Sequence, residues 1–155
     1  MDVSIDRSDL LILQCLAENA TLTHKEIGSR VHLSGQAVGL RVRKLEDAGI
    51  IEGYSARLSA PLLGLGMEGF VLIFLKSPME HERFQDFIQK AEPVEEAHRI
   101  SGDGCYWLRV RMPGLPELDA FLDEVLQYGN YKLYLSVKRL KSVGVDPLRA
   151  LPPQL

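Results

Sequence analysis

Apolar residues in the first third of the chain recur every three or four positions, the spacing of one buried face of an α-helix. Three such runs are present, at 10–17, 27–31 and 38–48. Each run follows a residue whose side-chain oxygen can cap a helix N-terminus: Asp6, Thr23 and Ser34. Gly49 ends the third run. The pattern predicts three helices, followed by an extended segment from Ile50 to about residue 58.

The apolar pattern changes beyond residue 66. Strand-like runs, two of them with alternating apolar and polar residues, are mixed with helical spacing. The predicted order is strand, helix, strand, strand, helix, strand, at 70–76, 84–91, 94–101, 106–112, 118–125 and 133–137. This βαββαβ order is typical of the ferredoxin-like arrangement.

The two patterns divide the chain into parts. We predict a three-helix domain at 1–54 and a ferredoxin-like domain at 67–143. Residues 55–66, which include Pro61 and two glycines, are predicted to be a linker strand or hinge. Residues 144–155 contain three prolines and are predicted to be a flexible tail. The fold class is therefore α+β.

Positive charge is concentrated at one place in an acidic chain. The 155 residues carry a formal net charge of -3, which excludes a polybasic, histone-like protein. No acidic residue stands between Glu26 and Glu46, whereas four basic residues do: Arg30, Arg41, Arg43 and Lys44. A basic segment in an acidic protein indicates an anionic partner, although a solvated helix face would give the same pattern.

Other classes of protein are disfavoured by composition. The longest uncharged apolar run, at 69–75, is far shorter than a membrane helix needs, and the acidic N-terminus lacks a signal-peptide core, so we expect a cytoplasmic protein. Cys15 and Cys105 form no disulfide or zinc pattern, and the four histidines have no metal-ligand spacing. The segment 64–69 fits G-x-G-x-x-G but precedes a strand, so it does not predict a dinucleotide site. We expect no cofactor and no metal.

Two short helices, a tight turn and a longer basic helix are the parts of a helix-turn-helix DNA-binding domain. If Val38 and the residues in register with it face the core, the opposite face of the third helix carries Gln36, Gly39, Leu40 and Arg43. Such a face fits the major groove, where glutamine can read adenine and arginine can read guanine or bind phosphate. A purely structural three-helix bundle is the alternative.

Small and polar residues complete this candidate interface. Gly39 would allow DNA to approach the helix closely, and Ser34 with the neighbouring amides could hold a phosphate at the helix N-terminus. The candidate DNA-binding residues are Ser34, Gly35, Gln36, Gly39, Leu40, Arg41, Arg43 and Lys44.

Several short motifs in register resemble those of the Lrp/AsnC family of transcription regulators. They span residues 4–141 and lie at 5–9, 33–34, 41–46, 49–51, 53–54, 63–64, 101–103 and 106–108. The resemblance implies a winged helix-turn-helix that binds double-stranded promoter DNA, close to the nucleoid. It also implies homodimers, often assembled into octamers of four dimers, and a response to amino acids held between effector domains. A free sheet face and strand edges agree with such assembly.

The effector loop of the family is only partly matched. The candidate effector-binding residues are Gly102, Asp103, Gly104, Cys105 and Tyr106. Cys105 stands where the family has a second Asp, and a thiol pairs poorly with an ammonium group. The effector is thus an amino acid, another small molecule, or absent. Cys105 itself could be a redox sensor, but a small strand residue explains it more simply.

Two other functions compete with DNA binding. The ferredoxin-like domain also occurs in enzymes, but no nucleophile, base and orienting group can be assembled here. The chain could also be a protein-interaction module that has kept the fold. The basic residues Arg41, Arg43 and Lys44 argue against that. We therefore predict a transcription regulator and not an enzyme.

Overall fold

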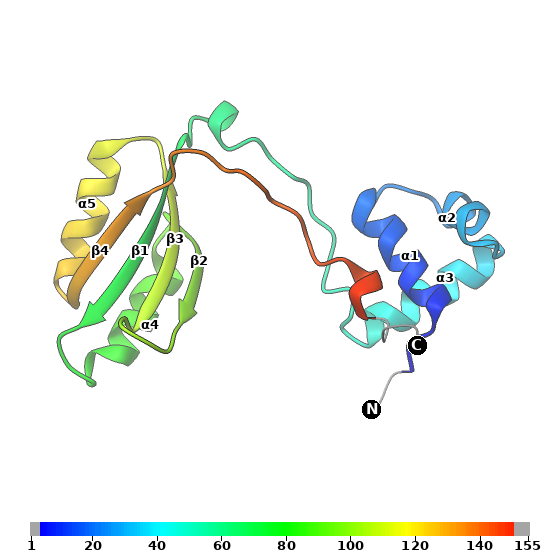
Figure 1. Cartoon of the computed structure of the whole chain (residues 1–155), viewed down its shortest axis with the longest axis horizontal. Coiled ribbons are helices and arrows are strands. Elements are labelled where there is room, and N and C mark those ends of the chain that lie inside the picture. Colours follow the sequence, from blue (N-terminus) through cyan, green and yellow to red (C-terminus); the bar gives the residue numbers. More distant parts are fainter. Residues whose placement is uncertain (1–3, 151–155) are drawn as a thin grey trace. The chain divides into compact units, whose positions relative to one another are not determined.

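The computed structural model describes residues 4–150, which form two compact units (Figure 1). The helical unit contains residues up to 57 together with those from 141 onward, and the sheet unit contains residues 58–140. The chain therefore leaves the helical unit, builds the sheet unit and returns. None of the helices in the described part of the chain has the length and apolar character needed to span a membrane.

Three capped helices build the helical unit: α1 (Arg7–Glu18), α2 (His24–Val31) and α3 (Gly35–Asp47). The side chains of Asp6, Thr23 and Ser34 each accept a hydrogen bond from a backbone amide in the first turn, as the sequence predicts. The apolar stripes of the helices meet in one core, whose buried side chains are Ile12, Cys15, Ile27, Val38 and Val42.

The turn between α2 and α3 is tight without a glycine at its centre. His32 ends α2 in the left-handed region, with φ of 58°. Gly28 makes the turn possible from inside α2, because a Cβ there would lie 2.4 Å from the carbonyl oxygen of Leu33. Beyond α3, residues 52–58 contain no strand, so this segment is extended without being paired.

The returning segment adds a short element to the helical unit. The 3-10 helix η2 (Pro147–Ala150) contacts α1, although the sequence predicts a flexible tail from residue 144 (Figure 1). Asp146 stabilises the turn, because its side chain accepts from the Leu148 amide and its carbonyl from the Arg149 amide, at 3.0 and 3.2 Å. Pro147 fixes the backbone of the first helical position.

The sheet unit has the predicted βαββαβ order. After the 3-10 helix η1 (Pro61–Leu63), its elements are β1 (Met67–Leu75), α4 (Glu80–Lys90), β2 (Val94–Arg99), β3 (Tyr106–Met112), α5 (Leu115–Leu126) and β4 (Gly129–Leu135). The strands form one antiparallel sheet in the order β2-β3-β1-β4. The strand β4 begins earlier than the pattern at 133–137 predicts, and Val137 lies beyond it, 99% exposed.

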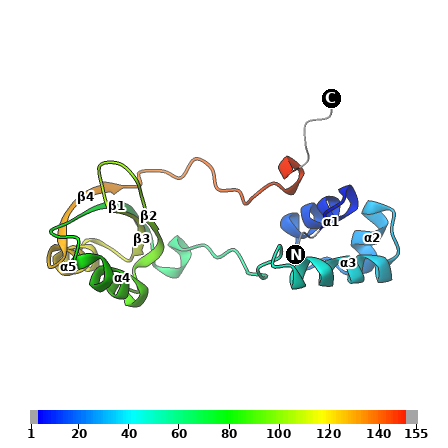
Figure 2. The same ribbon diagram turned by 90° about the horizontal axis from the view of Figure 1, so that it is seen from below.

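The two faces of the sheet differ. Figure 2 shows α4 and α5 on the same face, where they cover a core that includes Val71, Leu108, Phe84 and Phe121. The other face carries alternate residues of the strands, and we call it the open face: Glu68, Phe70 and Leu72 of β1, and Trp107, Arg109 and Arg111 of β3. Within the described sheet unit, no helix covers the open face.

Candidate DNA-binding and effector sites

One side of α3 faces solvent. Gln36, Leu40 and Arg43 are exposed, and Leu40 retains 66% of its accessible surface. They lie on the side of α3 away from Val38 and Val42, as the helical spacing predicts. Arg43 forms no hydrogen bond or ion pair with any residue in the described range. An exposed helix side with an unengaged guanidinium has the shape and charge to enter a major groove.

The N-terminus of α3 is built for close packing. The Ser34 hydroxyl accepts a hydrogen bond from the Ala37 amide at 3.1 Å, which leaves the first amides of the helix for other partners. A Cβ on Gly35 would lie 3.3 Å from the backbone of Lys25, so this glycine lets α3 approach α2. Gly35 therefore has a structural reason independent of DNA.

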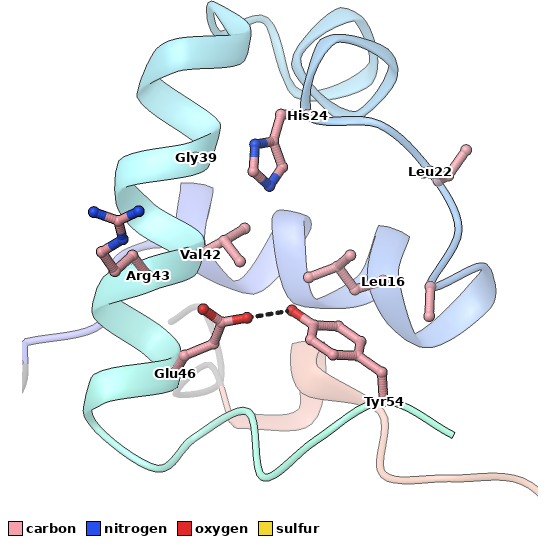
Figure 3. Close-up of a pocket in the computed structure, with 9 residues that line it drawn as sticks. Leu16, Leu22, His24, Gly39, Val42, Arg43, Glu46 and Tyr54 are labelled. Carbon is pink, nitrogen blue, oxygen red and sulfur yellow. Dashed lines mark hydrogen bonds between the residues drawn. The ribbon is translucent and has the colours of Figure 1, made fainter. Parts of the chain in front are cut away.

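Gly39 also has a packing reason that the sequence did not show. A Cβ at this position would lie 2.9 Å from Nδ1 of His24. The imidazole of α2 therefore lies directly against the bare backbone of α3 (Figure 3). This contact accounts for the glycine inside the helix without any approach of DNA.

A cleft of about 340 Å³ lies beside Gly39, lined on one side by α3 and on another by Tyr54. The Tyr54 hydroxyl donates to Oε1 of Glu46 at 2.8 Å (Figure 3). Burial raises the pKa of Tyr54, and so does the neighbouring Glu46 carboxylate. Arg43 lines the same cleft but remains unbonded among the described residues.

Arg41 and Lys44 differ from Arg43, because both are engaged with the start of α1. Nη1 of Arg41 lies 2.8 Å from Asp9 and 2.7 Å from Asp6, and Nζ of Lys44 lies 3.4 Å from Asp9 and 2.6 Å from the Ser4 carbonyl. The hydrogen bonds that Arg41 donates to Asp9 and Asp6 raise the pKa of Arg41. The amide of Asp9 and the guanidinium of Arg41 lower the pKa of Asp6.

Asp9 is the centre of this ion cluster. Its side chain is fully buried, and its other neighbour is the Asp6 amide, which donates to it. A buried carboxylate needs such partners, because desolvation of an unpaired charge is costly. In the sequence, Asp9 appears only as part of the family-like motif at 5–9, and its pairing with α3 could not be predicted.

The candidate effector residues differ in their exposure to solvent. Gly102, with φ of 117°, and Asp103 are exposed in the turn before β3. Gly104 is buried, and a Cβ at this position would lie 2.4 Å from the Leu72 side chain. Cys105 is half-buried and its amide donates to the Ile73 carbonyl at 2.7 Å.

Tyr106 begins β3 and its ring is buried under α4, where the hydroxyl accepts from Nε2 of Gln85 at 2.7 Å and is bonded to Nδ1 of His81 at 2.9 Å. Cys105 precedes the strand and packs against the same core. Tyr106 is therefore engaged within the core, whereas Asp103 is exposed in the turn.

A second ion cluster, absent from the sequence prediction, lies at the edge of the open face. Oε1 of Glu68 is 2.6 Å from Arg111 and 2.5 Å from Arg139, and Arg111 also bonds Glu95 at 2.7 Å. Burial raises the pKa of Glu68, but the hydrogen bond from Arg139 and the charges of Arg111 and Arg139 outweigh it, so the pKa falls below its ordinary value. No group of three His, Cys, Asp or Glu within residues 4–150 is arranged to hold a metal ion.

Known proteins match both units. Residues 5–52 match the family described as winged helix-turn-helix DNA-binding, and residues 68–145 match the Lrp/AsnC ligand binding domain. The chain belongs to the Lrp/AsnC family. The sequence resemblance is thereby confirmed, as is the fold class of a winged helix-turn-helix domain followed by a ferredoxin-like domain.

Relatives of this Lrp/AsnC protein are transcription regulators. It is 43% identical over 139 residues to the HTH-type transcriptional regulator LrpB of Bacillus subtilis, covering 90% of this chain and 93% of the relative. It is 36% identical over 124 residues to the leucine-responsive regulatory protein of Escherichia coli K12, covering 79% and 76%. A Neisseria meningitidis regulator solved with L-methionine has a TM-score of 0.85 at 28% identity, covering 90% and 94%. The chain is therefore a DNA-binding transcription regulator and not an enzyme.

Proposed function

We propose that this regulator reads its operator with the exposed side of α3. Gln36 and Arg43 contact base edges in the major groove, Leu40 contacts an apolar base edge such as a thymine methyl, and Ser34 with the first amides of α3 binds a phosphate. The observation that supports this most directly is the contrast on α3, where Arg43 is exposed and unbonded among the described residues while the other cations are paired.

Arg41, Lys44, Gly35 and Gly39 have a supporting part in this proposal. Arg41 and Lys44 fix α3 against α1 and contribute positive charge to the nearby DNA backbone. Gly35 and Gly39 fix α3 against α2. Together they orient the reading side without contacting a base.

We further propose that two copies pair through the open faces of their sheets. Phe70 and Trp107 stack there with ring centroids 5.3 Å apart, and Tyr134 is 56% exposed opposite Phe70 in register. Exposed aromatic surface of this kind is typical of protein interfaces. A dimer would present two copies of α3 to half-sites about one helical turn apart. Four such dimers would give an octamer that bends chromosomal DNA in the nucleoid.

An amino acid is the proposed effector class. The support is the match to the ligand binding domain and the relative solved with L-methionine. Asp103 is exposed and its carboxylate could pair with an ammonium group. Cys105, two residues later, is half-buried against the core and offers no second carboxylate.

A binding titration with the DNA upstream of its own gene tests whether α3 recognises an operator. We expect tight, salt-sensitive binding that prefers this DNA to unrelated DNA, and loss of the preference in Arg43→Gln. Equal binding of the wild type to both DNAs would contradict the proposed recognition of an operator.

Light scattering of the same samples tests the proposed dimer, which Trp107→Glu should dissociate. Adding the twenty amino acids one at a time to the titration tests the proposed effector.

A further inference from the structure

Glu46 stands where it could neutralise the proposed DNA contact. It lies three residues after Arg43 on α3, and opposite charges at this spacing are neighbours on a helix surface. In the structure the two are unpaired, because Oε1 of Glu46 accepts from the Tyr54 hydroxyl at 2.8 Å. Figure 3 shows the Glu46 carboxylate directed to Tyr54, with Arg43 extending from α3 without a bond to the residues drawn.

We propose that Tyr54 is a positioning residue for DNA binding, which holds Glu46 away from Arg43 and so keeps the guanidinium free for the operator. The inference rests on the proposed contact of Arg43 with DNA. Tyr54 reaches Glu46 from the segment after α3, so the chain that leaves the helical unit also decides which partner Glu46 has.

A tyrosine is well suited to this task. Its hydroxyl satisfies the Glu46 carboxylate without adding positive charge, whereas a lysine or arginine would alter the field that the DNA meets. A tyrosine hydroxyl is protonated near neutral pH and is therefore available as a donor. The ring is held in the cleft that Leu16 and Val42 also line.

Asp47 provides a matched comparison on the same helix. It lies four residues after Arg43, is exposed, and forms no hydrogen bond or ion pair with the described residues. Removing its charge also takes one negative charge from the helix near Arg43, but releases nothing from Tyr54. Asp47→Asn therefore measures the general effect of one carboxylate.

The experiment measures operator affinity as a function of salt for the full-length wild type, Tyr54→Phe, Glu46→Gln, the double variant Tyr54→Phe with Glu46→Gln, and Asp47→Asn. An exposed pair at this spacing changes an equilibrium by a factor of about two, so we expect Tyr54→Phe to weaken binding about two-fold per copy of α3, and about four-fold for two copies. The double variant should bind as Glu46→Gln does, because the carboxylate that Tyr54 holds is absent from both proteins.

The outcomes distinguish the inference from the proposed DNA contact on which it rests. If Arg43→Gln weakens binding but Tyr54→Phe does not, the inference is overturned and the DNA contact stands. If Arg43→Gln has no effect, the contact itself fails. If Tyr54→Phe weakens binding equally in the wild type and in Glu46→Gln, Tyr54 acts only through the fold and the inference is again overturned. A thermal melt of each variant by circular dichroism detects unfolding.

Discussion

The two sides of α3 carry similar residues and have different surroundings. On one side, Arg41 and Lys44 surround the fully buried carboxylate of Asp9 at the start of α1. On the other, Arg43 is exposed and has no partner among the described residues. All three lie within four positions of one basic segment. Two of these cations hold the helix in place, and in the function proposed above the third meets the DNA.

The sheet unit contains the same kind of structural cluster. Glu68 is paired with Arg111 and Arg139 much as Asp9 is paired with Arg41 and Lys44. In both cases two cations from distant parts of the chain enclose one carboxylate that is nearly or fully buried. Such clusters fix the relative positions of the elements that they join, because removal of one charged partner leaves the other charge uncompensated.

The largest effect is expected for Asp9→Ala. Removing the buried carboxylate leaves Arg41 with the exposed Asp6 alone and Lys44 with the Ser4 carbonyl alone. It should lower the unfolding free energy of the helical unit by about 3–5 kcal/mol. Urea unfolding followed by circular dichroism at 222 nm measures it. Fluorescence of the single tryptophan, Trp107, reports the sheet unit and should be unchanged. Asp6→Ala, at an exposed partner of Arg41, is the control and should cost much less; equal costs would contradict the assigned role of Asp9.

Arg43→Gln should affect DNA binding and leave stability unchanged. Removing an interaction with a base edge costs about 1–3 kcal/mol, and the slope of the salt dependence should fall by about one for each phosphate that Arg43 no longer neutralises. Titration at several salt concentrations measures both. Arg30→Gln is the control, since Arg30 lies outside α3 and only approaches Glu18 at 3.9 Å. A loss of stability without a loss of affinity would place Arg43 with the structural cations.

Ending the chain after Lys141 should have a smaller effect on the helical unit. Pro147 and Leu148 are half-buried, and Pro147 and Ala150 line a cavity of about 750 Å³ together with the nearly buried Leu10 of α1. Exposing this apolar surface should cost about 1–2 kcal/mol. Urea unfolding of the helical unit, followed by circular dichroism at 222 nm, measures this loss of stability. A chain ending after Ala150 keeps η2 and should match the full chain; a similar loss in both would refute a role for η2.

The smallest effect is a pH dependence of the sheet unit. The pKa of Glu68 is lowered from its ordinary 4.5 in the folded protein, so its stabilising contribution is complete above that value and is lost as the pH falls through the lowered pKa. The urea midpoint from Trp107 fluorescence should therefore decrease between about pH 5 and 3 beyond the loss seen in Glu68→Gln. Parallel profiles in the two proteins would show that other carboxylates dominate.

Local features of the sequence predicted much of this fold. The caps Asp6, Thr23 and Ser34, the helical stripes and the alternation at Tyr106–Met112 all depend on neighbours within a few residues, and the structure confirms them. The exposed position of Gln36, Leu40 and Arg43 follows from the same periodicity. Their contacts with DNA remain a prediction.

Features that depend on distant contacts could not be predicted in this way. Nothing near Gly39 in the sequence shows that the His24 ring lies against it, and nothing near Cys105 shows that Tyr106 bonds Gln85 and His81 of α4. The return of the chain to α1 through Pro147 was likewise hidden in a segment that reads as a tail. Proline and polar content indicate local disorder only when no partner surface is available.

The sequence by itself determined the order of the elements, the faces of the helices and the family, because periodicity, caps and short motifs are local and survive without a partner. Only the tertiary structure decided which cations of the basic segment are free. Arg41 and Arg43 are the same residue type two positions apart, but a helix rotates by about 200° over two residues. One of them therefore meets Asp9, and the other faces solvent.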